Sequence, residues 1–346
     1  MTVASTTSPA AGQPASLTGG PARGGSLTGL LDNDWVRFAG RRTSRLLVSI
    51  WVLVTASFLM IHLIPGDPVR AALGPTAPIA LVEARRQALG LSDPLLAQYG
   101  HFVKGLFTGD LGTSFSTGLP VWNVIGQRLP STVQLALLAF VVALAIAVPL
   151  GIVMGILTGG GRRRHSELAF SGTTVVIGSI PEFLLGVGMV ALFAVKLDWL
   201  PVAGRSTPSS YVLPVLALAI GPGVSLARIL RVDMLAVLQA DFIRTARAKR
   251  LPARKIYLKH ATPNALTATI TLGGLLLSAL VAGTVLVENV FAWPGLGTTI
   301  VASILQKDYP LVQGIVLVYG AGVLLINTVV DVALALLDPR STIRES

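Results

Sequence analysis

The chain has 346 residues, of which 52% are hydrophobic and only 12% are charged, and its mean hydropathy is +0.72. Soluble domains carry roughly 25% charged residues, so this composition indicates an integral membrane protein. The net charge of +11 is divided among apolar runs and forms no basic face interleaved with aromatic residues, which argues against a nucleic-acid partner. Cysteine is absent, which excludes disulfides, a thiol nucleophile and Cys-ligated metal sites.

Residues 1–34 are rich in Ala, Gly, Ser, Thr and Pro and show no apolar periodicity, which predicts a disordered N-terminal tail. The start of the chain has no short apolar core followed by a cleavage site. We therefore predict no secretory signal there, and we expect the later apolar run to stay in the membrane.

Six segments are long and apolar enough to cross a bilayer, whose hydrocarbon core of about 30 Å takes about 20 helical residues. They are residues 43–64, 131–157, 168–195, 211–238, 265–287 and 311–337. The fourth is the least regular, because Pro222 and its Gly neighbours should bend it and because Arg228 and Arg231 place its end outside the hydrocarbon. The predicted fold class is therefore an all-α integral membrane protein with six transmembrane helices.

Orientation follows from the distribution of basic residues. With the N-terminus inside, 19 of the 27 Lys and Arg residues lie on the cytoplasmic side of the predicted spans. The positive-inside rule then places both termini in the cytoplasm and predicts a multi-pass protein of the cell membrane.

Residues 65–130 form the longest polar stretch and are predicted to lie outside the cell, ahead of a transmembrane core over residues 131–339. The stretch opens with IPGDPV, and residues 80–89 are predicted to form an amphipathic helix ended by Gly90. The phrases LSDPLLAQY, GDLGTS and RLPSTVQLALLA follow it. By themselves these residues predict turns and short helices and no chemistry.

Three features inside the spans are candidates for a specific role. Gly151, Gly155 and Gly159 recur every four residues and permit close helix packing, either between subunits or within one. Glu182 in the third span and Asn327 in the last are polar at membrane depth, so both are candidates for the translocation pathway. For Glu182, a structural carboxylate that is protonated or paired remains an equal alternative.

Residues 240–263, ADFIRTARAKRLPARKIYLKHATP, form a basic amphipathic segment between the fourth and fifth spans. Pro252 is expected to end one short helix and begin another, and the small residues Thr245, Ala246 and Ala248 would let another protein's backbone approach closely. The alternative is a basic loop that only fixes topology or touches anionic lipid.

The order of residues in this segment resembles the EAA loop of ABC-importer permeases. RTARAKRLPARKIYLKHATPNAL is similar to the version found in peptide-importer subunits, and the phrases IPGDP, GDLGTS and RLPSTVQLALLA resemble the same group. FAWPGLGTTI, at residues 291–300, resembles a re-entrant or outer-surface segment of that family; alone, Trp293 would be an ordinary interfacial aromatic residue. The likeness covers about residues 43–339. It identifies the dipeptide and oligopeptide permeases, together with related nickel and glutathione permeases.

The resemblance implies a complex around this chain. Its partners would be a second homologous permease in a heterodimer, two cytoplasmic ATP-binding subunits, an extracytoplasmic substrate-binding protein and membrane lipid. ATP and Mg would be bound by the ATPase subunits, and this chain would bind no cofactor and no metal. The residues expected to couple it to the ATPases are Asp241, Arg244, Thr245, Ala246, Arg247, Ala248, Lys249 and Arg254.

Arg250 departs from the family pattern, which has Gly at that position. A left-handed conformation there would cost Arg roughly 1–2 kcal/mol. We therefore expect the first helix to continue until Pro252 breaks it, an arrangement that needs no special partner. A partner groove with an acidic contact for Arg250 is the alternative.

Recognisable catalytic motifs are missing, so the chain is not expected to be an enzyme. It contains no G-x-x-x-x-G-K-[ST] phosphate loop, no H-E-x-x-H and no G-x-S-x-G. The predicted function is that of a permease subunit forming half of a peptide importer's pathway; a self-sufficient secondary transporter is the alternative. Dipeptides, oligopeptides, glutathione and nickel complexes remain open as substrates.

Overall fold

The structure is a computed structural model that describes residues 34–63, 67–74, 76–88, 90–161 and 163–337. The predicted tail lies outside these residues except for Asp34, where the first helix begins. Among the described residues, five helices are long and apolar enough to span a membrane, and the number rises to six if a strongly bent pair is counted as one span. The all-α class and the predicted six spans therefore agree with the architecture.

The long helices are α2 (Asp34–Leu63), α6 (Val121–Thr158), α7 (Arg164–Gly178), α9 (Val212–Gln239), α12 (Thr262–Val290) and α14 (Tyr309–Leu337). Shorter ones are α3 (Pro68–Leu73), α4 (Ile79–Ala88), α5 (Leu95–Thr108), α8 (Glu182–Met189), α10 (Asp241–Ala248), α11 (Ala253–Lys255) and α13 (Leu296–Leu305). Two π-helical segments, η2 (Val190–Lys196) and η4 (Ile256–Ala261), extend α8 and α11.

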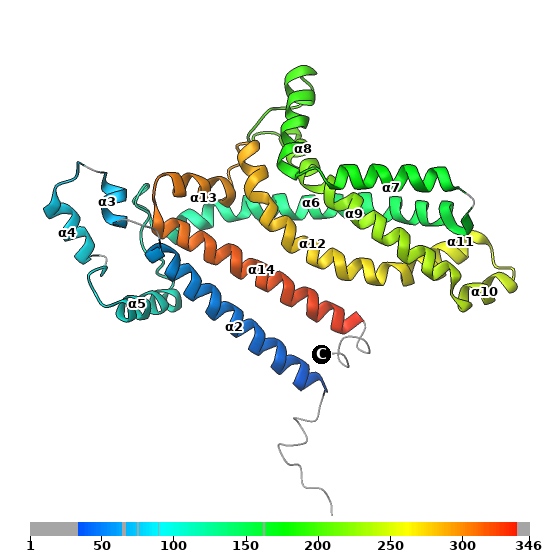
Figure 1. Ribbon diagram of the computed structural model, residues 1–346, viewed down its shortest axis with the longest axis horizontal. Helices are drawn as coiled ribbons and strands as arrows, with labels where there is room; N and C mark the ends of the chain where they lie inside the picture. Colours follow the sequence, from blue (N-terminus) through cyan, green and yellow to red (C-terminus); the bar gives the residue numbers. More distant parts are fainter. Residues whose placement is uncertain (1–33, 64–66, 75, 89, 162, 338–346) are drawn as a thin grey trace, which may run out of the picture.

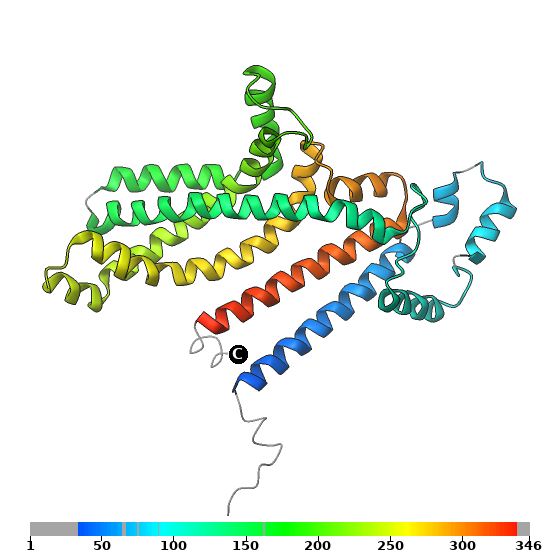
Figure 2. The same cartoon turned by 180° about the vertical axis from the view of Figure 1, so that it is seen from behind.

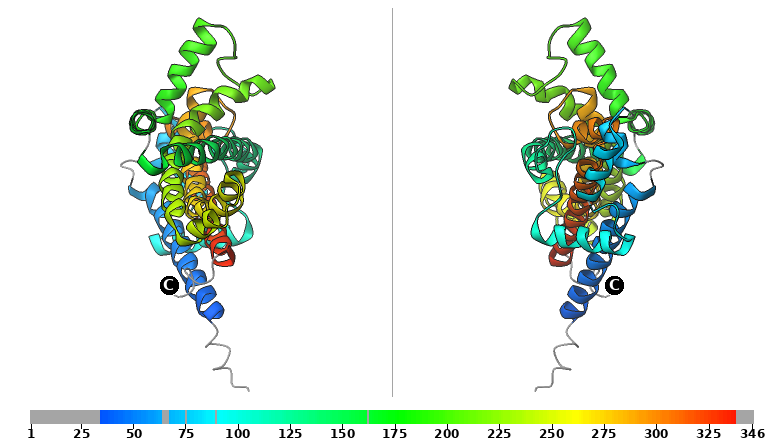
Figure 3. Two further views of the ribbon diagram at one scale, coloured as in Figure 1. Left: turned by 90° about the vertical axis from the view of Figure 1, so that its right-hand side faces the viewer. Right: turned by 90° about the vertical axis from the view of Figure 1, so that its left-hand side faces the viewer.

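The long helices run side by side. The polar segment between α2 and α6 and the basic segment between α9 and α12 lie at opposite ends of the molecule (Figure 1). Helices α3, α4 and α5 lie beyond one end, and α10 and α11 lie at the other. The reverse view shows α6, α9 and α12 packed together, with α14 against α12 and α2 against α14 (Figure 2). Helix α8 projects from the group (Figure 3).

The tightest packing joins α6 to α9 through the predicted glycines. A Cβ on Gly151 would lie 2.8 Å from the Ala227 carbonyl oxygen, and one on Gly155 would lie 2.7 Å from the Met234 Cβ. Both distances are shorter than real Cβ contacts, so only glycine allows this approach. Of the two roles left open by the sequence, the structure shows packing within one subunit. Gly159 contributes less, since its nearest neighbour would be 3.8 Å away.

The third predicted span is not one straight helix, which corrects the sequence expectation. Helices α7 and α8 meet at an angle of 93°. Pro181 lies between them; it has no N–H to donate, and it disfavours helical geometry at the residue before it. The Ser179 hydroxyl donates to the Val175 carbonyl at 2.7 Å, which satisfies part of the exposed end of α7.

The fourth predicted span is α9, a single helix that continues through Pro222 to Gln239. Arg231, in the second half of α9, is buried within the protein. Its Nη2 lies 2.7 Å from a carboxylate oxygen of Glu167 on α7, and its Nε donates to the Thr158 hydroxyl on α6 at 3.0 Å. The charge is tolerated because a carboxylate and a hydroxyl replace water.

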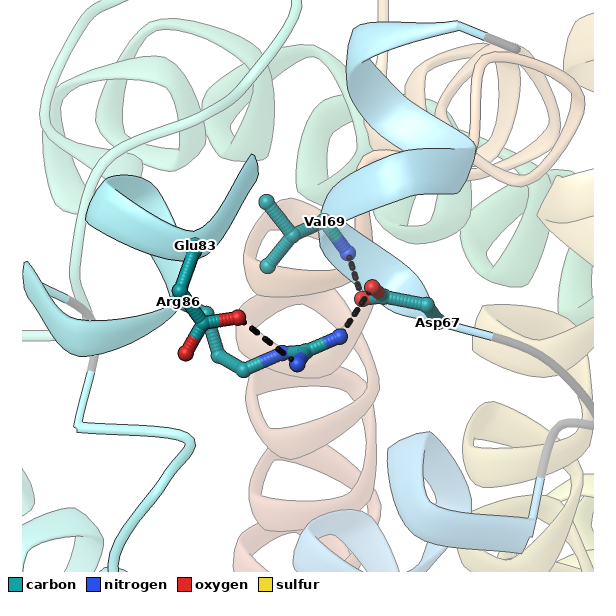
Figure 4. Close-up of polar contacts among 4 residues, drawn as sticks. All are labelled: Asp67, Val69, Glu83 and Arg86. Atoms are coloured by element: carbon teal, nitrogen blue, oxygen red, sulfur yellow. Dashed lines mark hydrogen bonds and ion pairs between the residues drawn. The ribbon is translucent and has the colours of Figure 1, made fainter. Parts of the chain in front are cut away.

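Residues 67–110 form a small helical extension that follows α2, with its turn chemistry as predicted. Asp67 caps α3 by accepting from the Val69 N–H at 3.0 Å, and Arg86 on α4 bridges Asp67 and Glu83 (Figure 4). Burial alone raises the pKa of Asp67, but hydrogen bonds from Arg86 and the backbone lower it below its usual value. The predicted helix ending at Gly90 is α4, shifted by one residue at each end.

Candidate docking site on the basic loop

The segment 240–263 folds as two short helical pieces that are anchored to the spans by apolar side chains. Ile243 and Ala246 on α10 and Ile256 on η4 are buried against Leu230 and Met234 of α9. The remaining residues of α10 are exposed and mostly polar, apart from Phe242 and Ala248, so the helix is held from one side only. The loop is therefore attached to α9 by its apolar face, and its basic face is exposed on the surface of the protein.

Arg250 ends the first helix in a left-handed conformation, with φ +53°, so the expectation that the helix continues to Pro252 is wrong. The Arg250 N–H donates to the Arg247 carbonyl at 2.9 Å, and the Leu251 N–H donates to the Ala246 carbonyl at 3.3 Å. These two bonds form the Schellman motif that usually has glycine at this position. They recover orphan carbonyls at the helix end and so offset part of the strain in Arg250.

Seven of the eight residues predicted to couple to the ATPases are exposed on this loop, and one is not. The exposed ones are Asp241, Arg244, Thr245, Arg247, Ala248, Lys249 and Arg254. Ala246 is only 7% exposed and packs toward α9. The suggestion that Ala246 offers close approach to another protein is therefore wrong: its small side chain serves the chain's own packing, and Thr245 and Ala248 remain the small exposed residues.

The exposed face of the loop is strongly basic. Asp241 is the segment's only acidic residue, and one of its carboxylate oxygens lies 3.3 Å from the Arg244 guanidinium, leaving the other cations without a carboxylate partner in the described chain. Those exposed cations are Arg247, Lys249, Arg250, Arg254, Lys255 and Lys259. Such a face suits an acidic partner surface and forbids insertion into hydrocarbon.

The two pathway candidates lie on different helices and are not brought together. Glu182 begins α8 directly after the Pro181 bend and is partly exposed, with Gly283 of α12 close by. Asn327 on α14 accepts a hydrogen bond from the Ser278 hydroxyl of α12 at 2.7 Å. Asn327 thus joins two helices, whereas Glu182 has no hydrogen-bond partner among the described residues.

Sequence reasoning missed a buried carboxylate, Glu288, near the end of α12. It accepts from the Thr132 hydroxyl at 2.6 Å and from the backbone N–H groups of Gly297 and Thr298 at 2.6 and 3.3 Å. Glu288 therefore holds the first turn of α13 against α6. Its signal in the sequence was an acidic residue three positions before FAWPGLG. Trp293 in that phrase is completely buried, so its reading as an interfacial aromatic residue is wrong.

Asp308 is a second missed carboxylate, placed just before α14. It accepts from the hydroxyl of Ser116 at 2.7 Å and from the backbone N–H groups of Phe115 and Ser116 at 3.0 and 3.1 Å. Burial alone raises the pKa of Asp308, but the hydrogen bonds from Ser114, Ser116 and the backbone lower it below its usual value. Asp308 thereby ties the GDLGTS turn to the start of the last span.

The part of the chain that the structure describes contains no group of three or more His, Asp or Glu residues that could hold a metal ion. The structure combines a bundle of spans with a surface-exposed basic loop at one end and a network of buried polar contacts at the other.

Comparisons with known proteins agree with this arrangement. Residues 147–343 match the family described as "Binding-protein-dependent transport system inner membrane component", and residues 35–136 match its N-terminal family. The glutathione transport system permease protein GsiC of Pectobacterium atrosepticum is 38% identical over 300 residues, covering 86% of this chain and 96% of the relative. GsiC of Escherichia coli K12 is 36% identical with the same coverage.

A solved structure supports the same fold. The MetNI methionine ABC transporter in inward-facing conformations aligns with a TM-score of 0.50 and 20% identity, covering 62% of this chain and 96% of the matched chain. At that identity the likeness concerns the fold alone.

Proposed function

The chain belongs to the inner-membrane components of binding-protein-dependent transport systems, and from that premise we propose that it forms half of an importer's pathway for glutathione or small peptides. It is an ABC-importer permease and a multi-pass inner-membrane protein, not itself an enzyme, and partner ATPase subunits bind the nucleotide. The alternative of a self-sufficient secondary transporter is therefore wrong.

The substrate class rests on one observation, the similarity to glutathione permeases over 86% of the chain. Glutathione is itself a short peptide, so this similarity favours peptide-like substrates, including dipeptides and oligopeptides, over nickel complexes. We propose the partner set of a second homologous permease, two ATPases and an extracytoplasmic binding protein.

We propose that the exposed face of α10 and α11 docks on an ATPase subunit. Arg244, Arg247, Lys249 and Arg254 would donate charge-assisted hydrogen bonds to an acidic groove, with Asp241 orienting Arg244. Thr245 and Ala248 would allow the partner's backbone to approach. Because Ile243 and Ala246 attach α10 to α9, a push on the loop would be transmitted directly to the fourth span.

Import would require that the ATPase bind the loop with different free energies in its open and closed states, since equal affinity shifts no equilibrium. Glu182 at the bend between α7 and α8 is the better of the two pathway candidates, because Asn327 is bonded to Ser278. We also propose the orientation that the distribution of basic residues favours. In it, both termini and the basic loop face the cytoplasm, and the α3–α5 extension lies outside the cell.

Co-purification with the ATPases tests the docking surface. Arg247→Glu should reduce recovery of the ATPases at least about tenfold, since several charge-assisted contacts would become repulsive. Lys259→Glu is the matched control: it reverses an exposed cation of the same loop outside the proposed set. Equal loss in both variants, or in neither, would contradict the assignment. Uptake of glutathione and alanyl-alanine into vesicles by the complete importer tests the substrate class.

A further inference from the structure

Arg205 lies in the connection between η2 and α9 and is held by three neutral side chains. Its Nε donates to the Tyr211 hydroxyl at 2.8 Å, its Nη1 to the Ser131 hydroxyl at 2.6 Å and its Nη2 to the Gln134 carbonyl oxygen at 2.6 Å. Its guanidinium carbon also lies 5.9 Å from the centre of the Trp293 ring. The cation therefore has a defined position and orientation.

The groups that hold Arg205 are themselves fixed. The buried Trp293 indole donates to the Ser131 carbonyl at 3.1 Å and meets the Tyr211 ring edge-on, with centroids 4.7 Å apart. The loop before Arg205 is tied down by the Gly204 N–H, which donates to the Phe291 carbonyl at 2.9 Å. Gly204 has φ +91°, a conformation that favours glycine.

No carboxylate neutralises Arg205 within the described residues. The other arginines with hydrogen-bonded or ion-paired guanidinium groups each pair with a carboxylate: Arg42 with Asp331, Arg86 with Asp67 and Glu83, Arg231 with Glu167, and Arg244 with Asp241. Arg205 uses three of its five N–H groups on neutral oxygens and remains exposed. Its full charge and two N–H groups are left for an anion.

Its position in the fold gives the anion a source. Arg205 precedes α9, whose far end leads into α10, so Arg205 and the basic loop lie at opposite ends of the same span. In the orientation proposed above, Arg205 lies at the outer end, where substrate arrives.

We propose that Arg205 binds a carboxylate group of the imported substrate as it enters from the outer side. The proposal rests on the proposed function, since glutathione and peptides all carry at least one free carboxylate. A planar guanidinium can bind a carboxylate through two parallel hydrogen bonds. Because the neighbouring side chains already hold Arg205 in place, binding would cost it little conformational entropy. Arg205 would thus contribute to selecting anionic substrates.

The test compares two substrates and three variants in the complete importer reconstituted in vesicles. The probes are alanyl-alanine and its C-terminal amide, which lacks the carboxylate. The variants are Arg205→Gln, Arg205→Lys and, as control, Arg128→Gln, which removes another exposed cation near the same end of the molecule. Hydrogen bonds to a charged group predict that Arg205→Gln raises the KM for alanyl-alanine about 10- to 100-fold.

The same change should leave the KM for the amide within about threefold, Arg205→Lys should fall between Gln and wild type, and Arg128→Gln should resemble wild type. Equal effects on both probes, or no effect, would overturn the proposal. So would loss of a partner subunit on purification, or a weaker response of ATP hydrolysis to the binding protein, since Arg205 would then bind a protein carboxylate.

Failure of the proposed substrate class is distinguishable from failure at Arg205. If the importer takes up neither glutathione nor alanyl-alanine, mass spectrometry of vesicles incubated with a mixture of small solutes identifies what it does import. A carboxylate-bearing solute whose uptake falls in Arg205→Gln supports the role of Arg205 and refutes the peptide assignment. A solute without a carboxylate overturns both.

Discussion

Arg231 on α9 and Glu167 on α7 form an ion pair, with Nη2 and Oε1 2.7 Å apart, that is buried on the arginine side and half exposed on the glutamate side. The Arg231 Nε also donates to Thr158 on α6, so one guanidinium joins three helices. The pair lies toward the cytoplasmic ends of these helices in the proposed orientation. It stabilises the part of the bundle to which the basic loop is attached.

Removing one member of this pair should therefore destabilise the protein. Breaking a fully buried pair costs about 3–5 kcal/mol, and exposed pairs contribute about 1 kcal/mol or less. With Glu167 half exposed, we expect Glu167→Gln to cost about 1–2 kcal/mol, measured as a lower unfolding temperature in detergent. The double variant Glu167→Gln, Arg231→Met should recover most of the loss, because no uncompensated charge stays buried. Additive losses would show that the ion pair is unimportant.

Replacing Arg250 by glycine should stabilise the end of α10. The left-handed backbone costs arginine roughly 1–2 kcal/mol, of which glycine's greater freedom in the unfolded state returns a part. We expect a net gain of about 0.5–1 kcal/mol, seen as slower hydrogen exchange at the amides of residues 250 and 251. Arg250→Ala keeps the strain and removes the charge, so it should show no such gain. If both variants lose the ATPases on purification, Arg250 contacts the partner after all.

Gly151 should not tolerate even a methyl group. An added Cβ would lie 2.8 Å from both the Ala227 carbonyl oxygen and the Leu230 Cβ, so α6 and α9 would have to separate. Overpacking of this kind costs about 1–3 kcal/mol, and Gly151→Ala should lower the unfolding temperature. Gly172→Ala is the matched control, because nothing lies within 4 Å of its added Cβ in the exposed face of α7. It should be neutral or stabilising.

The contact between Asp308 and the GDLGTS turn should weaken in acid. Because the folded-state pKa of Asp308 is lowered, its stabilising contribution is complete above the unfolded value of about 3.9 and is lost as pH falls through the folded value. The protection of residues 111–120 against hydrogen exchange, relative to the intrinsic exchange rate at each pH, should therefore fall below about pH 4 in the wild type. In Asp308→Asn the same segment should be less protected at neutral pH, and its protection should change little with acid. A wild-type profile without this acid step would contradict the assignment.

The proposed orientation can be tested with single cysteines, because the native chain has none. An impermeant maleimide applied to intact cells should label Ser92→Cys, in the turn between α4 and α5, and should miss Lys259→Cys, on the basic loop but outside the proposed docking set. Both positions are exposed, and neither has a positive φ, so substitution should not disturb the backbone. In cells whose membranes have been permeabilised, both should react. The reverse pattern in intact cells would overturn the orientation and with it the docking proposal.

Much of this protein is determined locally, and the sequence alone carries that part. Apolar runs long enough to cross a bilayer, the turn at IPGDPV, and the amphipathic pattern of residues 240–263 each depend on neighbouring residues, so composition and spacing predict them. The family resemblance rests on the same short phrases. An apolar run of this length satisfies all of its backbone hydrogen bonds inside a bilayer by forming a helix, so a helical bundle follows.

Other features were decided by residues far apart in the chain. The sequence predicts Ala246 to be a surface residue, but Leu230 and Met234 cover it. It predicts Trp293 to be interfacial, but the residue is buried against α6. Glu288, Asp308, Arg231 and Arg205 each acquire their partners from other elements, so no local pattern identifies them. A buried charge is stable only where tertiary packing brings donors or a counter-charge to it, and that meeting is a property of the fold.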